Sequence, residues 1–296
     1  MGTVSVEIKP DEEGYMGREC PECEKYFKIM PGTGLPDFSD CYCPYCQHFG
    51  SQDVFWTKQQ IKYAQSVALN KISGELIKTM KKMERKPERN QFISIGISVK
   101  GKPTPITYYT EKELEEKVTC SNCTLEYTIY GAFGFCPDCA THNSKQIVEA
   151  NFELVLKILE LAKESTPDIK AKLIENALED CISAFDGFAR EHCSQLYSKL
   201  SFQNISNAKQ KLNNEHSIDI SADLEGNEWT FVVNQFQKRH LLAHKMGVID
   251  EEFVNKTNIH SENIGKKVTI IESDVICVIQ HLKVIVNNIT KNVQRS

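Results

Sequence analysis

Four C-x2-C pairs hold eight of the twelve cysteines, and this spacing constrains the fold more than any other feature of the chain. The pairs are Cys20/Cys23, Cys43/Cys46, Cys120/Cys123 and Cys136/Cys139. A C-x2-C turn points two thiolates at one ion, and two such turns complete a tetrahedral site of four sulfurs. In a reducing compartment the spacing indicates metal and not disulfides. Because thiolates in a closed fourfold site favour Zn²⁺, we predict two structural zinc sites.

Each predicted zinc site belongs to a small β ribbon. Nineteen residues separate the first two pairs and twelve separate the last two. The second insert is strand-like, with Gly131 and Gly134 as turn residues. A chance cluster of buried thiols and an iron–sulfur site are the alternatives. Cys41 and His48 flank the pair Cys43/Cys46, which leaves the fourth ligand of the first site open.

A long helix is predicted between the two ribbons, beginning near Thr57. Its apolar face is formed by Ile61, Ala64, Ala68, Ile72, Leu76 and Met80, at spacings of three and four. Its basic end contains Lys78, Lys81, Lys82, Arg85, Lys86 and Arg89, and Pro87 stops the helix. We favour a solvated helix end stabilised by the macrodipole over a phosphate-backbone contact. The stretch 91–109 then alternates like one or two strands.

Long helices are predicted from about residue 144 to the end of the chain. Thr166 and Pro167 provide the N-cap and first turn of the second of these helices. Residues 201–225 are polar and are predicted to be a loop or a broken helix. Asn227 is the expected N-cap of the next helix, and Gly247 its C-terminal stop. A short helix after Asp250 and a last helix from near Asp274 complete a bundle of about four to five helices. Three further cysteines in these helical patterns are expected to be core residues: Cys181, Cys193 and Cys277.

The predicted fold class is therefore α+β, mainly α. We divide the chain into zinc ribbon 1 (1–56), a linking helix with a basic end (57–89), short strands with zinc ribbon 2 (90–143), and a helical domain (144–296). The net charge of −5 means that any nucleic-acid contact needs a local basic surface. The first residues do not have the pattern of a secretory signal, and no apolar run approaches the ~18 residues of a membrane span. We expect a cytoplasmic protein without a membrane partner.

The stretch RHLLAH, residues 239–244, is the main candidate for catalysis. One interpretation is structural, because cations near a helix C-terminus are stabilised by the dipole. A second is a metal site, since His240 and His244 are four apart on one helix face, although the H-E-x-x-H signature is missing. A third is phosphate chemistry, because arginine suits phosphate and histidine transfers protons near neutral pH.

This stretch resembles the motif of HEPN ribonucleases: arginine, a polar residue, three more residues, then histidine. Residues 144–296 also resemble a HEPN domain, with a long helix containing ENALEDCISAFDGFAREH, then the motif helix and a final amphipathic helix. The zinc modules are not part of the HEPN pattern and resemble accessory zinc ribbons.

The resemblance implies a metal-independent endoribonuclease that acts as a homodimer. His244 would deprotonate the ribose 2′-hydroxyl or protonate the leaving oxygen, Arg239 would stabilise charge on the phosphate, and His240 would orient the substrate. The implied products carry a 2′,3′-cyclic phosphate and a 5′-hydroxyl. A toxin or phage-defence effector, restrained by a separate inhibitory or regulatory protein, is the implied setting.

Two other functions remain open at this stage. The chain could be a non-catalytic zinc-ribbon factor that binds nucleic acid or protein and dimerises through its helical domain. It could also be a zinc-dependent hydrolase that uses His240 and His244.

Overall fold

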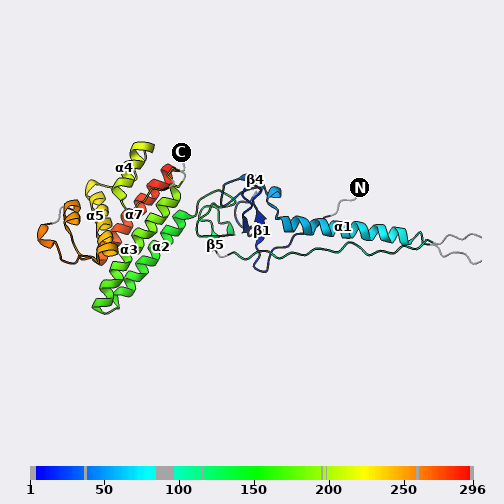
Figure 1. Ribbon diagram of the computed structural model, residues 1–296, viewed down its shortest axis with the longest axis horizontal. Coiled ribbons are helices and arrows are strands. Elements are labelled where there is room, and N and C mark those ends of the chain that lie inside the picture. The colour runs from blue at the N-terminus through cyan, green and yellow to red at the C-terminus, as the bar shows by residue number, and fades with distance from the viewer. Residues whose placement is uncertain are drawn as a thin grey trace, which may run out of the picture. The chain divides into compact units, whose positions relative to one another are not determined.

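The computed structural model describes residues 5–36, 39–84, 97–114, 116–194, 196–197, 199–257 and 260–293. The chain divides into two compact units, residues 1–141 and 142–296. The first unit contains short strands and one long helix, and the second is helical (Figure 1). The predicted α+β class with mainly helical content is confirmed.

One antiparallel sheet joins the two predicted ribbons in the first unit. Its strands are β1 (Met16–Glu19), β2 (Tyr26–Ile29), β6 (Glu126–Ile129) and β5 (Glu116–Thr119), in that spatial order. The join is made by β2 and β6, where Lys28 pairs with Thr128 and Ile29 with Tyr127. Strands β3 (Asp40–Tyr42) and β4 (Phe49–Ser51) form a separate hairpin. The two cysteine modules therefore share one sheet.

The core of the first unit lies between the cysteine turns. Its apolar members come from both modules: Phe27, Ile29, Phe55, Leu125, Tyr127 and Ile129. Phe27 and Phe55 meet edge to face, with ring centroids 6.0 Å apart. Phe55 closes the short 3₁₀ helix η1 (Gln52–Phe55), which leads into the long helix. Burial of these apolar side chains stabilises the first unit in addition to any metal bound by the cysteines.

Helix α1 (Lys58–Lys81) begins at a capping box formed by Thr57 and Gln60, near the predicted start. Lys82 is its C-cap, whereas Arg85, Lys86, Pro87 and Arg89, predicted to form and stop its basic end, lie outside the described residues. Residues 97–114 run back along α1 (Figure 1).

Of the one or two strands predicted within 91–109, residues 91–96 lie outside the described residues and Ile97 forms a β-bridge, whereas residues 98–109 contain no strand, so the prediction is wrong for that part. The backbone N–H groups of Thr104 and Thr107 donate instead to the hydroxyls of Ser73 and Ser66 on α1, at 3.0 and 2.9 Å. Pro103 and Pro105, which have no N–H to give to a ladder, also disfavour strand pairing here.

The second unit is built from helices that pack around α3. They are α2 (Ser144–Lys163), α3 (Pro167–His192), α4 (Ile205–His216), α5 (Gly226–Lys245), α6 (Glu251–Thr257), the 3₁₀ helix η2 (Ser261–Asn263) and α7 (Glu272–Val293). α3 contacts α2, α5 and α7. At its centre the ring of Phe185 meets those of Phe202 and Phe236 at 6.1 and 6.0 Å. None of the described helices is both long and apolar enough to cross a lipid bilayer.

Two local predictions in this unit are corrected. Residues 201–225 contain the helix α4, because the side chain of Asn204 accepts from the N–H of Asn207 and three apolar residues at helical spacing are buried: Ile205, Ala208 and Leu212. α5 begins two residues earlier than predicted, since Glu225 and not Asn227 is the N-cap and forms a capping box with Glu228.

The three cysteines assigned to the helical core differ in burial. Cys181 and Cys193 are fully buried, as predicted. Cys277 is half-buried, and its Sγ lies 3.3 Å from Nε2 of His281, one turn further along α7. Burial and the nearby carboxylate of Asp274 raise the pKa of the Cys277 thiol, so it stays protonated near neutral pH.

Candidate functional site

All four C-x2-C pairs adopt the same backbone turn. In each turn, the residue after the second cysteine donates its N–H to the carbonyl of the first cysteine, at 2.9 to 3.0 Å. These donor residues are Glu24, Gln47, Thr124 and Ala140, and their φ angles are 55° to 64°. Such left-handed backbone is uncommon outside glycine. Its use four times by other residues shows that the turns are built alike.

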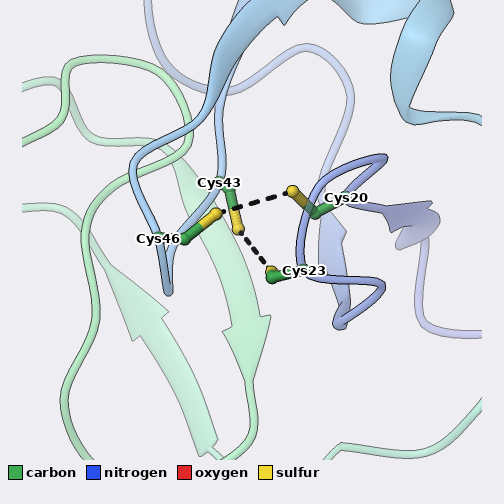
Figure 2. Close-up of side chains that lie close together, drawn as sticks. All are labelled: Cys20, Cys23, Cys43 and Cys46. Carbon is green, nitrogen blue, oxygen red and sulfur yellow. Dashed lines mark hydrogen bonds between the residues drawn. The ribbon is translucent and has the colours of Figure 1, made fainter.

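The first cysteine cluster gathers the sulfurs of Cys20, Cys23, Cys43 and Cys46 (Figure 2). Sγ of Cys20 lies 3.7 Å from Sγ of Cys46, and Sγ of Cys23 lies 3.6 Å from Sγ of Cys43. Cys46 is thus the fourth member. Cys41, which flanks the cluster, bonds to the carbonyl of Tyr42, and burial raises the pKa of its thiol to about 12.

The second cluster is formed by Cys120, Cys123, Cys136 and Cys139. Its closest sulfur contacts are 3.6 Å, between Cys120 and Cys139, and 3.5 Å, between Cys123 and Cys136. Backbone N–H groups point at two of these sulfurs, from Asn122 to Cys120 and from Asp138 to Cys136. Such N–H···S contacts stabilise thiolate charge.

Both clusters suit a structural zinc ion. Within each, the ligand sulfurs all lie within 4.8 Å of one another. Sulfurs at tetrahedral corners about 2.3 Å from zinc would lie roughly 3.8 Å apart, close to the observed contacts. Hydrogen bonding within the second cluster lowers the pKa of Cys120, so one of its sulfurs already favours the thiolate that a metal needs. A site closed by four sulfurs has no open position for a substrate, so these sites suit a structural role.

The candidate catalytic residues lie at the C-terminal end of α5. His240 and His244 are both exposed, and their ring centroids are 4.8 Å apart. The structure therefore brings the two imidazoles together, as their spacing of four residues predicts. Among the described residues, the groups of three or more metal-binding donors are the two cysteine clusters, and neither includes these histidines.

Arg239 extends to the neighbouring helix and not along the histidine face. Its Nη2 lies 3.5 Å from Oγ of Ser183 on α3, at the limit of a hydrogen bond. Its Nε is covered and has no hydrogen-bond partner among the described residues. One turn earlier on α5, Oε1 of the buried Gln235 is also covered and accepts no hydrogen bond from the described residues. The Nε–H of Arg239 is thus a buried donor without a partner among the described residues.

The surroundings of His240 favour its neutral form. Partial desolvation lowers the pKa of His240, although the residue is largely exposed, and the neighbouring His244 imidazole lowers it further. The positive charges of Lys245 and Lys256 act in the same direction, whereas Glu252 opposes them. A neutral imidazole can accept a proton or a hydrogen bond at neutral pH. The end of α5 therefore combines a proton acceptor with an arginine.

A compact loop fixes this end of the helix. Met246 and Gly247 both have positive φ, and the N–H of Gly247 donates to the carbonyl of Leu241 at 2.9 Å. The chain then turns back, and the Val268 N–H donates to the Gly247 carbonyl at 2.8 Å. Lys245 pairs with Asp250 at the start of α6. The predicted stop at Gly247 thus lies one residue beyond the C-cap, Met246.

Sequence reasoning missed Ser183 and Gln235 as neighbours of Arg239. Gln235 could have been found, because it lies four residues before Arg239 and so on the same helix face. Ser183 could not, since its position depends on how α3 packs against α5. The chain matches no protein-family model, and no curated protein or solved structure proves significantly similar to it.

Proposed function

We propose that the protein is a metal-independent endoribonuclease whose catalytic groups are Arg239, His240 and His244. The observation that carries this proposal is the pair of exposed imidazoles in contact at the end of α5, next in the sequence to Arg239. The HEPN resemblance of the same six residues supports it.

The proposed chemistry uses the ribose 2′-hydroxyl as the nucleophile. His244 takes the proton of this hydroxyl or gives one to the leaving 5′-oxygen, and the neutral His240 orients substrate or partner groups. Arg239 stabilises the charge that builds up on the phosphate. The products carry a 2′,3′-cyclic phosphate and a 5′-hydroxyl. DNA resists cleavage because it has no 2′-hydroxyl.

One copy of α5 does not complete this site. Arg239 and His244 are five residues apart, which places them about 140° apart around the helix axis and ~7.5 Å apart along it. A second copy related by a two-fold axis would bring two arginines and two histidine pairs around one phosphate. We therefore propose that the active form is a homodimer through the helical unit. Release of this activity in a growing cell would arrest growth, which fits a toxin or defence effector.

The proposal is tested by incubating the purified protein with RNA and with DNA of the same sequence, in Mg²⁺ and in brief EDTA. We expect cleavage of RNA alone, in both buffers, with 2′,3′-cyclic phosphate ends. The substitution His244→Ala should lower the rate by roughly 10²- to 10⁴-fold, and Arg239→Ala by about 10²- to 10³-fold. His260→Ala, at an exposed histidine outside α5, is the matched control and should cleave normally.

The alternatives predict other results. A zinc-ribbon factor without catalytic activity gives no cleavage in any buffer while still binding nucleic acid or a protein. A hydrolase that uses His240 and His244 as metal ligands loses activity in EDTA and regains it with added zinc. Circular dichroism of each variant shows whether a lost activity reflects unfolding.

A further inference from the structure

The four large residues of the apolar face predicted for α1 are exposed, whereas its two alanines, Ala64 and Ala68, are partly buried. Six large apolar side chains on this helix and just beyond its end are 44% to 63% exposed: Ile61, Leu69, Ile72, Leu76, Met80 and Met83. At 100° per residue they fall within a stripe about 100° wide. We call these six residues the α1 stripe. A contiguous row of this kind is unusual on a surface that contacts only water.

The returning chain segment covers a different side of the helix. Side chains of Ser66, Asn70 and Ser73 hydrogen-bond to residues 104–107 of this segment. The ring of Tyr63 contacts those of Tyr108 and Tyr109, at 6.1 and 5.6 Å. Because these contacts occupy the flank next to the α1 stripe, the described part of the return, residues 97–114, leaves the stripe itself exposed.

The spacing of the α1 stripe is that of a helix-packing seam. Together with Gln65, its members recur at intervals of four, four and three residues, so that Ile61, Ile72 and Met83 are eleven apart. An eleven-residue repeat keeps apolar positions on one side of a nearly straight helix over its whole length. α1 has 24 residues, which makes it about 36 Å long. The stripe thus fits another long helix.

We propose that the α1 stripe binds the same stripe of a second copy of this chain, in an antiparallel helix pair centred next to Ile72. In this register, Leu69 of one copy faces Leu76 of the other, and Gln65 faces Met80. The two copies of Ile72 then pack against each other across the two-fold axis. The proposal does not rest on the proposed nuclease activity.

The charges beside the α1 stripe favour this partner and orientation. Lys71 and Glu75 lie on the same flank of α1, so in the antiparallel pair Lys71 of each copy lies beside Glu75 of the other. Lys82 lies on that flank too and faces the small residue Ala64 of the second copy, whereas Lys78 lies on the side of the helix away from the contact. No like charges oppose each other along this flank.

Cysteine cross-linking of the full-length protein tests the register. Gln65→Cys and Met80→Cys proteins, mixed and oxidised in air, should give a disulfide-linked dimer on a non-reducing gel, whereas each alone should not exceed the unsubstituted background. In the proposed pair, the two copies of residue 65 lie about 22 Å apart along the axis. Linking of Gln65→Cys to itself would indicate a parallel pair and overturn the proposal, as would failure of the mixture to link.

Charge exchange provides the second test. Lys71→Glu should lower the yield of the cross-link between Gln65→Cys and Met80→Cys by about tenfold, because the altered contact occurs twice across the axis. This yield reports the α1 contact alone, whether or not the helical units also associate. The double substitution Lys71→Glu/Glu75→Lys restores the opposite charges and should restore the yield. Leu154→Glu, at an exposed leucine of α2, is the control and should leave the yield unchanged. An equal yield with and without Lys71→Glu, or no rescue by the double substitution, would refute the α1 contact even if RNA cleavage is found.

Discussion

The imidazole rings of His240 and His244 lie 4.8 Å apart between centroids, one turn apart on α5. Two imidazoles at this distance repel each other when both are positively charged. This repulsion contributes to the lowered pKa of His240. This coupling applies whether the end of α5 cleaves RNA, binds a metal or only caps the bundle.

We predict that His240 titrates below the ordinary histidine value of about 6.5. Since His244 is one cause of the lowered pKa, His244→Asn should raise the pKa of His240, while burial keeps it below the ordinary value. NMR titration of the His240 ring proton in both proteins measures this shift. An unchanged pKa in His244→Asn would show that the two rings do not interact in solution.

We predict that Gly247→Ala destabilises the helical unit by more than about 1 kcal/mol. Gly247 has a φ of +77°, and a Cβ there would lie 3.3 Å from both Leu242 and Lys267. Gly187→Ala is the matched control, because a Cβ at this position within α3 meets no atom within 4 Å. It should stabilise the unit by about 0.5–1 kcal/mol. Urea unfolding of the three proteins measures both effects, and equal losses would contradict the role of the left-handed turn.

The features that could be predicted from the sequence are those set by local spacing. The C-x2-C turns and the meeting of His240 with His244 depend on residues a few positions apart, whose geometry the helix or turn fixes. The segment that contains α4 was predicted to be a loop or a broken helix because most of its residues are polar and only three residues of α4 are buried. Its overall polarity therefore outweighed the helical spacing of those three apolar residues.

Contacts between distant segments could not be predicted. The pairing of Lys28 with Thr128 joins residues one hundred positions apart, and nothing in either ribbon specifies the other as its neighbour. The contact of Arg239 with Ser183 likewise depends on how two helices pack. The surroundings of the α1 stripe could not be predicted either, because periodicity identifies an apolar helix face but not the segment that packs on it.

We predict that the two cysteine clusters are coupled through their shared sheet. The purified protein should contain two zinc ions per chain. Cys123→Ser should lose one of them, and a chelator should then remove the other at a lower concentration, since β6 supports β2. Cys41→Ala is the control and should keep both ions, because this buried thiol lies outside the clusters. Zinc content follows from atomic absorption, and independent loss from the two sites would contradict the coupling.

We predict that acid destabilises the helical unit through His142. Its Nδ1 accepts the N–H of Ser144 at 3.1 Å, which requires an unprotonated nitrogen, and burial with the nearby His192 lowers its pKa to about 4. The unfolded chain, with a pKa of about 6.5, binds the proton more readily. The neutral His142 therefore contributes fully to the free energy of unfolding above about pH 6.5. As the pH falls toward 4, this contribution is lost, and the free energy of unfolding decreases by roughly 2–3 kcal/mol.

Trp229 reports on the helical unit alone when Trp56, the other tryptophan, is replaced by phenylalanine. In this background, urea unfolding followed by fluorescence at pH 7 and pH 4.5 gives the pH dependence of stability. His142→Gln keeps an acceptor for the Ser144 N–H but cannot become charged, so its stability should fall less between these pH values. Burial also lowers the pKa of His192, so some acid sensitivity should remain. If the stability falls equally between pH 7 and pH 4.5 with and without His142, the acid sensitivity arises from other groups.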